Sequence, residues 1–245
     1  MKVVALIPAR YDSQRFPGKL LAKLGENSVI FQTYLGAVNT GLFEEVFVVT
    51  DSDAIYEEII THKGKAVKSK KEHQSGTDRI AEAAEEMEAD IIINIQGDEP
   101  FVKKEQMAAL IDVFARDQKR EVDIASLMTK IENKEDFLNP NNVKVVVDKR
   151  NFALYFSRAP IPFPREGEFE FAYKHIGIYA FRKSVLREVT QLPVSRLEEI
   201  EKLENLRFLE NGYKIKMVET GQANIGIDTP EDLERAIEFY KRKNI

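Results

Sequence analysis

The sequence predicts an α/β fold: an open, mostly parallel sheet with helices on both faces, extended by a smaller antiparallel or mixed β region. Over the first 117 residues, four short apolar segments alternate with amphipathic segments, which is the pattern of βαβ units in a Rossmann-like sheet. From residue 123 onward, apolar segments follow one another with little helical sequence between them. This change of pattern predicts the antiparallel or mixed extension.

The parallel half is built from four strands and four helices. Strands are expected at residues 3–7, 46–50, 66–68 and 91–95, and helices at residues 28–39, 51–62, 75–87 and 103–117. Gly41 and Gly64 end the first two helices. Ser75 and Asp78 have the Ser-x-x-Asp spacing of a capping box, which predicts the start of the third helix.

The second half contains further strands and two helices. Strands are expected at residues 123–129, 143–147, 153–157 and 175–181, and residues 158–170, with three prolines, are expected to form a loop. A leucine-rich pattern predicts a helix over residues 196–211. Residues 224–228 are strand-like, and Thr229 and Pro230 are suited to the N-cap and first position of a last helix.

Length and composition limit the class of protein. The 245 residues suit one domain, 1–245, with a smaller lobe formed mainly from about residues 123–215. The absence of cysteine excludes disulfides and thiolate chemistry and fits a cytoplasmic location, and the net charge of −5 argues against a nucleic-acid partner. The apolar N-terminal segment is too short for a signal peptide or a membrane span, so no membrane partner is expected.

The loop after the first strand carries three cations: Arg10, Arg15 and Lys19. Ligands of open α/β sheets bind at the carboxyl ends of the strands, and clustered cations there suggest a polyphosphate. No Walker loop and no G-x-G-x-x-G occurs, so side chains are expected to hold the phosphates.

Two aspartates follow apolar segments that end at the same edge of the predicted sheet. Asp98 comes after residues 91–95, and Asp228 comes after residues 225–227. Two carboxylates at adjacent strand ends can share a Mg²⁺ that also binds substrate phosphates. Asp51 and Glu99 are competing candidates for this role, and Asp228 also lies next to a helix cap.

Two further groups of residues are candidates for binding. The N-terminus of the helix that begins at Ser75 and Gly76 suits a phosphate, a ribose or a base edge. His175 and Tyr179 are four residues apart on a predicted strand and so share a face; with Arg158 they could bind a carboxylate and hydroxyls. No H-E-x-x-H and no G-x-S-x-G is present, which disfavours zinc and serine hydrolases.

These segments together resemble the CMP-Kdo synthetases, also called 3-deoxy-manno-octulosonate cytidylyltransferases. The matching segments lie in the family's order at residues 7–10, 16–20, 73–79, 94–100, 141–147, 153–162, 175–179, 197–207 and 226–233. The resemblance implies a nucleotide-diphospho-sugar transferase-like fold and a cytoplasmic homodimer. It also implies a Mg²⁺-dependent transfer of CMP from CTP to the anomeric hydroxyl of 3-deoxy-D-manno-octulosonate (Kdo), with release of pyrophosphate, for lipopolysaccharide biosynthesis.

The resemblance also implies a role for each matching residue. Lys19 and Arg10, assisted by Arg15, would stabilise the triphosphate and its transition state, and Asp98 and Asp228 would bind magnesium. The nucleotide would be bound by Pro8, Ala9, Ser75, Gly76 and Arg79. The sugar acid would be bound by Gln96, Arg158, His175, Tyr179, Glu204 and Asn205, and the smaller lobe would carry sugar binding and the dimer contact.

Three departures from the family pattern leave the sugar open. Leu20 follows the Pro-Gly-Lys sequence, residues 68–70 read Lys-Ser-Lys, and Asn205 is present where glutamine is usual. Because asparagine is one methylene shorter, a sugar contact could lengthen or include a water, so the substrate could instead be a related acid sugar such as 8-amino-Kdo. A metal-dependent glycosyltransferase and a non-catalytic nucleotide-sensing module are two rival interpretations of the same residues.

Overall fold

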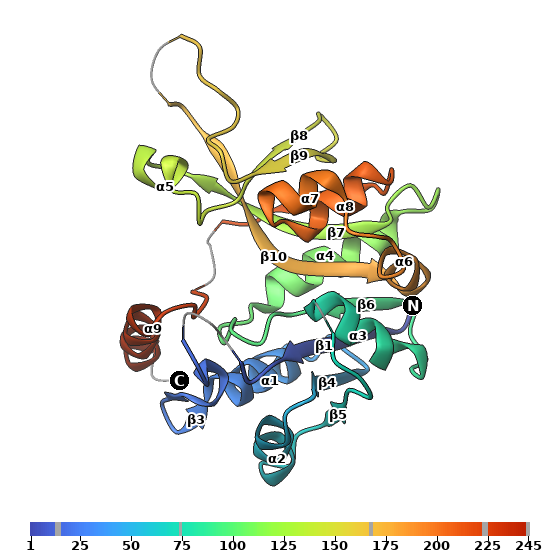
Figure 1. Cartoon of the computed structure of the whole chain (residues 1–245), viewed down its shortest axis with the longest axis vertical. Helices are drawn as coiled ribbons and strands as arrows, with labels where there is room; N and C mark the ends of the chain where they lie inside the picture. The colour runs from blue at the N-terminus through green and yellow to red at the C-terminus, as the bar shows by residue number, and fades with distance from the viewer. Residues whose placement is uncertain (13–15, 74, 167–168, 222–224, 244–245) are drawn as a thin grey trace. The chain divides into compact units, whose positions relative to one another are not determined.

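The computed structural model describes residues 1–12, 16–73, 75–166, 169–221 and 225–243 (Figure 1). The chain forms two compact units: unit 1 comprises Met1–Ala108 and Asn224–Ile245, and unit 2 comprises Ala109–Ala223. The predicted α/β class is confirmed, because unit 1 is built on a parallel sheet with helices and unit 2 on a mixed sheet.

The parallel sheet of unit 1 has the strand order β6-β1-β4-β5. Its strands are β1 (Val3–Ala9), β4 (Glu45–Thr50), β5 (Ala66–Lys68) and β6 (Ile91–Asn94), as the apolar segments predicted. Every residue of β1 is buried, since this central strand is covered by helices on both faces. The carboxyl ends of β1 and β6 therefore lie side by side, and the residues that follow them can form one site.

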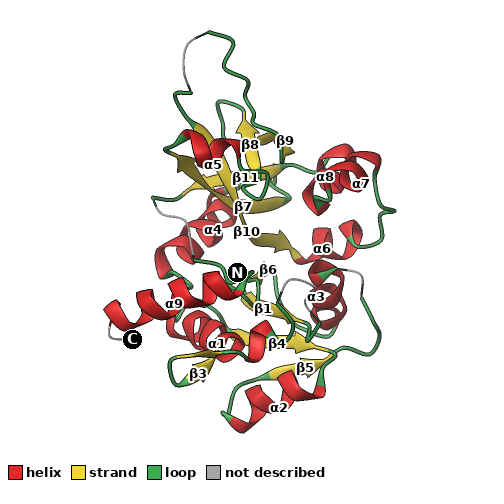
Figure 2. Cartoon of the chain, turned by 60° about the vertical axis from the view of Figure 1, so that its left-hand side comes forward, coloured by secondary structure: helices red, strands yellow, loops and turns green. Residues whose placement is uncertain are grey.

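Unit 1 contains the helices α1 (Val29–Asn39), α2 (Asp53–Thr61), α3 (Gly76–Glu85) and α9 (Pro230–Lys243). Ser28 and Ser52 cap α1 and α2 by accepting backbone N–H bonds. Figure 2 shows α1 on one side of the sheet and α3 on the other, as right-handed crossovers in opposite directions require. The short helix η1 (Lys19–Leu21) and the hairpin of β2 (Lys23–Leu24) and β3 (Asn27–Ser28) were not predicted.

Unit 2 is centred on β7 (Ile124–Ile131), which pairs antiparallel with β10 (Ala172–Arg182) and parallel with β11 (Ile215–Glu219). The hairpin of β8 (Lys144–Val147) and β9 (Ala153–Ser157) extends from β10. The chain enters this unit within α4 (Lys104–Arg116), and α5 (Lys134–Leu138) and α6 (Lys183–Val189) connect strands. Strand β11 was missed, although its buried Ile215 and Met217 alternate with more exposed residues.

Two element predictions are wrong. The helix expected over residues 196–211 is two helices, α7 (Arg196–Glu201) and α8 (Glu204–Glu210), because Lys202 adopts a left-handed conformation with φ of 53° and ends α7. Residues 225–228 form no strand; the backbone N–H of Ile227 instead donates to the carbonyl of Asp98 at 2.9 Å. Residue 224 lies outside the described residues.

No helix in the described parts of the chain has both the length and the apolar composition needed to cross a membrane.

Candidate active site

Lys19 is held at the end of the loop that follows β1. Gly18 supplies a left-handed conformation with φ of 69°, which glycine adopts without strain, and Lys19 begins η1 immediately after it. The Lys19 side chain is 13% exposed, and its Nζ lies 2.5 Å from Asp98 Oδ2 and 3.1 Å from Asp228 Oδ1. One ammonium group thus brings together the two predicted metal-binding carboxylates.

The electrostatics of this cluster favour a charged lysine. Burial alone would lower the pKa of Lys19, but the charges of Asp98 and Asp228 and their hydrogen bonds to Nζ outweigh it and leave the pKa raised. The site therefore holds a full positive charge between two negative ones.

The backbone fixes both aspartates. Asp98 lies four residues after the end of β6, and the segment before Asp228 is tied to it by the hydrogen bond from the Ile227 N–H to the Asp98 carbonyl. The Asp232 carboxylate accepts hydrogen bonds from the backbone N–H groups of Asp228 and Thr229, and Asp232 N–H donates to Thr229 Oγ1 at 3.3 Å. The predicted cap of α9 therefore also holds the metal candidate Asp228 in place.

The donor set fits a hard divalent cation. Among the described residues, no group of three or more histidine, aspartate or glutamate side chains is placed so that it could hold a metal ion by itself. Two converging carboxylates supply only oxygen ligands, which suits Mg²⁺, because that ion usually keeps several waters and takes substrate phosphates as its remaining ligands.

The predicted nucleotide residues lie together beside β1. Ser75 caps α3 and forms the full capping box with Asp78, as predicted. A Cβ on Gly76 would lie 3.1 Å from Pro8 Cγ, a tight contact, so glycine lets the first turn of α3 approach β1 closely without displacing Pro8. The N-terminus of α3, whose first backbone N–H groups have no acceptor within the helix itself, thus adjoins the end of β1.

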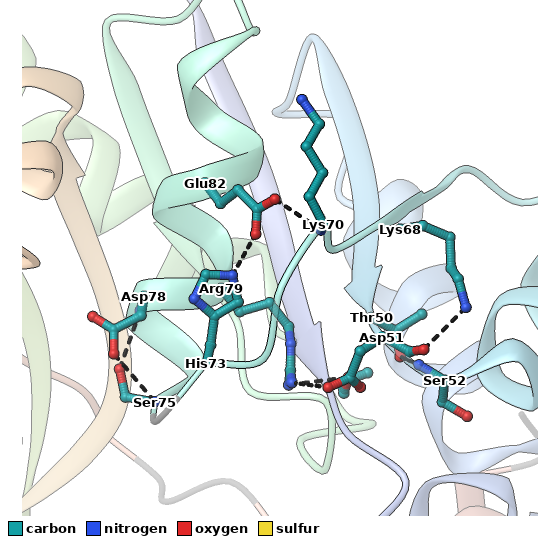
Figure 3. Close-up of polar contacts among 11 residues, drawn as sticks. Thr50, Asp51, Ser52, Lys68, Lys70, His73, Ser75, Asp78, Arg79 and Glu82 are labelled. Carbon is teal, nitrogen blue, oxygen red and sulfur yellow. Dashed lines mark hydrogen bonds and ion pairs between the residues drawn. The ribbon is translucent and has the colours of Figure 1, made fainter.

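Arg79 joins this region to β4. Its side chain is buried and donates to the Ala9 carbonyl at 3.2 Å and to Asp51 Oδ2 at 2.6 Å (Figure 3). Asp51, which the sequence left open as a metal ligand, is therefore paired with a guanidinium. Arg10 is exposed, and Arg15 lies outside the described residues.

In unit 2, His175 and Tyr179 lie on the same side of β10, with ring centroids 5.3 Å apart. Tyr179 lies near Asn205 and in the field of Glu204, both at the start of α8. Asn205 is buried, and its Oδ1 finds no hydrogen-bond partner in the parts of the chain that the structure describes. The structure thus brings together four of the six residues predicted to bind the sugar.

Burial sets the charge of both rings. It lowers the pKa of His175 to about 3, so the imidazole is neutral at physiological pH. It also raises the pKa of Tyr179, with the Glu204 charge acting in the same direction and the polar Asn205 side chain opposing them. This cluster therefore offers neutral hydrogen-bonding groups.

The remaining two predicted sugar residues have different surroundings. Arg158 donates through Nε to the Glu201 carbonyl at 2.9 Å and through Nη1 to the Pro140 carbonyl at 3.1 Å. Its guanidinium thus fastens the loop after β9 to the end of α7. Gln96 belongs to unit 1, where its Nε2 donates to Asn94 Oδ1 at 3.3 Å.

Sequence reasoning did not find Ser126 or Glu201. Ser126 Oγ contacts His175, and the Glu201 carboxylate accepts from Ser157 Oγ and from the Arg158 backbone. Neither residue lies in a recognisable motif. The signal that the sequence offered was the polar Ser126 within the apolar first half of β7, which is unusual for a buried position.

A parallel α/β unit with a cationic loop after β1, paired carboxylates and a helix N-terminus defines a nucleotidyltransferase-like protein. The comparisons agree: a family model described as cytidylyltransferase matches residues 4–215. The 3-deoxy-manno-octulosonate cytidylyltransferases of Christiangramia forsetii and Flavobacterium johnsoniae are 55% and 56% identical to the chain. Each alignment covers 96% of this chain, and 95% and 97% of the respective relatives.

A solved structure of CMP:2-keto-3-deoxy-manno-octonic acid synthetase complexed with CTP superimposes with a TM-score of 0.93 at 39% identity. The match covers 99% of this chain and 100% of that protein's chain. The chain belongs to the cytidylyltransferase family, among the 3-deoxy-manno-octulosonate cytidylyltransferases, which confirms the resemblance found in the sequence.

Proposed function

We propose that this cytidylyltransferase transfers CMP from CTP to the anomeric hydroxyl of Kdo. The hydroxyl oxygen forms a bond to the α-phosphorus, the bond from that phosphorus to the β-phosphate oxygen breaks, and pyrophosphate leaves with the electron pair. The hydroxyl proton passes to water. The product, CMP-Kdo, would supply lipopolysaccharide assembly.

The convergence of Lys19, Asp98 and Asp228 carries this proposal. Phosphoryl-group transfer needs little covalent chemistry from the protein; it needs position and charge neutralisation. The Lys19 ammonium supplies a full charge at the loop after β1, where the triphosphate is expected, and Arg10 and Arg15 would add to it. Asp98 and Asp228 would hold Mg²⁺, which supplies further neutralisation of the phosphate oxygens when bound.

The nucleotide would bind where α3 meets β1. Pro8, Ala9, Ser75 and Gly76 form a close backbone approach there, and the N-terminus of α3 carries the positive end of the helix dipole. Arg79 holds the Ala9 carbonyl and so keeps this edge of β1 in position.

The sugar acid would bind at the His175 cluster of unit 2. Neutral His175, protonated Tyr179 and Asn205 suit hydroxyl groups, while Gln96 and Arg158 are proposed for further polar contacts. Glu204 would favour a cationic or hydroxyl substituent, and an amino-substituted sugar such as 8-amino-Kdo is therefore included among the sugars to be assayed.

We also propose a homodimer through the lobe of about residues 123–215. Its exposed apolar side chains support this: Leu154, Phe163 and Ile200 are 62%, 81% and 68% exposed. The use of CTP and the absence of cysteine support a cytoplasmic location.

A pyrophosphate-release assay tests the function. CTP, UTP and ATP are each combined with Kdo, 8-amino-Kdo or sialic acid, with Mg²⁺ or with EDTA. The proposal predicts release only with CTP plus Kdo or its 8-amino analogue, and only with Mg²⁺. Asp98→Asn should abolish release, whereas Asp53→Asn removes the same charge from an exposed pair with Lys68 and should not. Equal release with all three nucleotides would contradict the assignment.

A further inference from the structure

Strand β10 contains an irregularity that places His175 beside Tyr179. In a regular strand, residues four apart are separated by about 13 Å. Here Ile176 pairs with Leu127 and Tyr179 with Ser126, so Gly177 and the residue after it bulge out of the ladder. Because two residues are inserted, both side chains remain on one face, and their rings come within 5.3 Å.

Ser126 lies opposite this bulge and is fully buried. Its Oγ lies 2.9 Å from His175 Nε2, 2.9 Å from the Ile178 carbonyl oxygen and 3.2 Å from the Ile176 carbonyl oxygen. One hydroxyl therefore bridges the two sides of the bulge and the histidine ring.

Counting protons assigns the direction of these bonds. A serine hydroxyl has one proton to donate, and a carbonyl oxygen can only accept. If Ser126 donated its proton to His175 Nε2, the serine oxygen would face each of the two carbonyl oxygens with no proton between them. If Ser126 donates to a carbonyl, its lone pair is free to accept, and Nε2 must carry the proton.

We propose that Ser126 is a positioning residue that holds His175 as the Nε2–H tautomer, so that Nδ1 is the hydrogen-bond acceptor presented to a substrate hydroxyl. No residue in the described parts of the chain forms a hydrogen bond to Nδ1. Phe156, edge-on at 5.1 Å, and Tyr179 fix the ring plane. The substrate part of this inference rests on the proposed function, but the tautomer does not.

The role differs from that of a cationic histidine. A neutral imidazole with a free Nδ1 accepts a hydrogen bond from a hydroxyl. It offers no donor to a carboxylate, because its one N–H, at Nε2, already donates to Ser126. His175 would therefore recognise a hydroxyl of the acid sugar. The carboxylate of that sugar must be bound by groups elsewhere in the site.

Nuclear magnetic resonance tests the tautomer on the unmodified chain. Two-bond ¹H–¹⁵N correlation at pH 7.5 reports each imidazole nitrogen, and the chain has only three histidines. His175→Phe identifies the signals to be assigned. We expect a protonated, pyrrole-type Nε2 and an unprotonated, pyridine-type Nδ1. A protonated Nδ1, or an imidazolium, would overturn the proposal.

Kinetics test the link to substrate. Ser126→Ala should shift the His175 nitrogen signals towards an average of the two tautomers and raise the KM for Kdo about tenfold, the effect of one lost hydrogen bond, with the KM for CTP unchanged. Thr190→Val, which removes a hydroxyl bonded to helix α6, should change neither KM. An unchanged nitrogen pattern, or an equal rise of both KM values, would overturn it.

A double-mutant cycle separates action through His175 from a general loss of packing. In the His175→Phe background, Ser126→Ala should have no further effect on the KM for Kdo, because its partner is gone. Additive effects would refute the positioning role. If the wild-type chain forms no pyrophosphate from CTP and Kdo while Nε2 is protonated, the proposed function fails and the tautomer assignment stands.

Discussion

The Lys19 ammonium provides the sharpest test of how the site works. In Lys19→Met, the side chain keeps most of its length and loses the charge between Asp98 and Asp228. Removing one preorganised charged donor from a phosphoryl-transfer site lowers the turnover number roughly 10²- to 10³-fold, or about 3–4 kcal/mol of barrier. The KM for Kdo should change less than about twofold, since the sugar is expected to bind at the His175 cluster.

The same substitution should leave the fold intact. Asp98 and Asp228 have side chains that are 27% and 49% exposed, so solvent screens both ion pairs and each contributes at most about 1 kcal/mol. The loss of free energy of unfolding is partly offset, because methionine has no charge that must be desolvated on folding. Thermal unfolding followed by circular dichroism should therefore show only a small decrease in the melting temperature.

Steady-state pyrophosphate release at saturating CTP and varied Kdo measures the effect. Lys23→Met is the matched control, because this exposed lysine lies on the same segment and, among the described residues, its ammonium hydrogen-bonds to a backbone carbonyl and to no carboxylate. A turnover number of Lys19→Met within about threefold of the wild type would refute the assigned role of the ammonium.

Three further variants probe the described contacts. Arg79→Met should raise the KM for CTP at least tenfold, because the Ala9 edge loses its guanidinium, and kinetics at saturating Kdo measure this. Arg207→Met should lower the free energy of unfolding by about 3 kcal/mol in urea titrations, since it leaves buried Glu198 unpaired. Burial alone would raise the pKa of Asp117, but backbone N–H bonds and Arg182 outweigh it and lower that pKa. The charged Asp117 therefore stabilises the fold above its unfolded pKa. In urea titrations, the difference in unfolding free energy between wild type and Asp117→Asn should shrink as the pH falls below about 4 towards the lowered folded pKa.

The sequence predicted the parallel unit well because its strands are buried on both faces and its helices carry local caps. Ser75 with Asp78 and Thr229 with Asp232 bracket the helices on which the site depends, and both boxes form as expected. The apolar segments that precede Asp98 and the loop of Lys19 predicted strands β6 and β1 equally clearly. Local signals of this kind are sufficient where contacts are short-range.

Features that depend on long-range contacts have no local pattern to encode them. The break at Lys202 falls within a continuous leucine pattern, so periodicity alone extended the helix through it. Ser126 matters because a bulge on another strand turns two carbonyls towards it, and the sequence carries no sign of that bulge. Likewise, the binding of the Arg158 guanidinium to carbonyls at residues 140 and 201 joins segments remote in sequence.

Phosphorus-31 nuclear magnetic resonance of one reaction tests the transfer of CMP to the sugar. With CTP, Kdo and Mg²⁺, the three CTP resonances should decline while a phosphodiester signal and inorganic pyrophosphate appear in equal amounts, with the phosphodiester coupled to the sugar. Unchanged CTP, or its hydrolysis to free CMP without a sugar conjugate, would contradict this transfer.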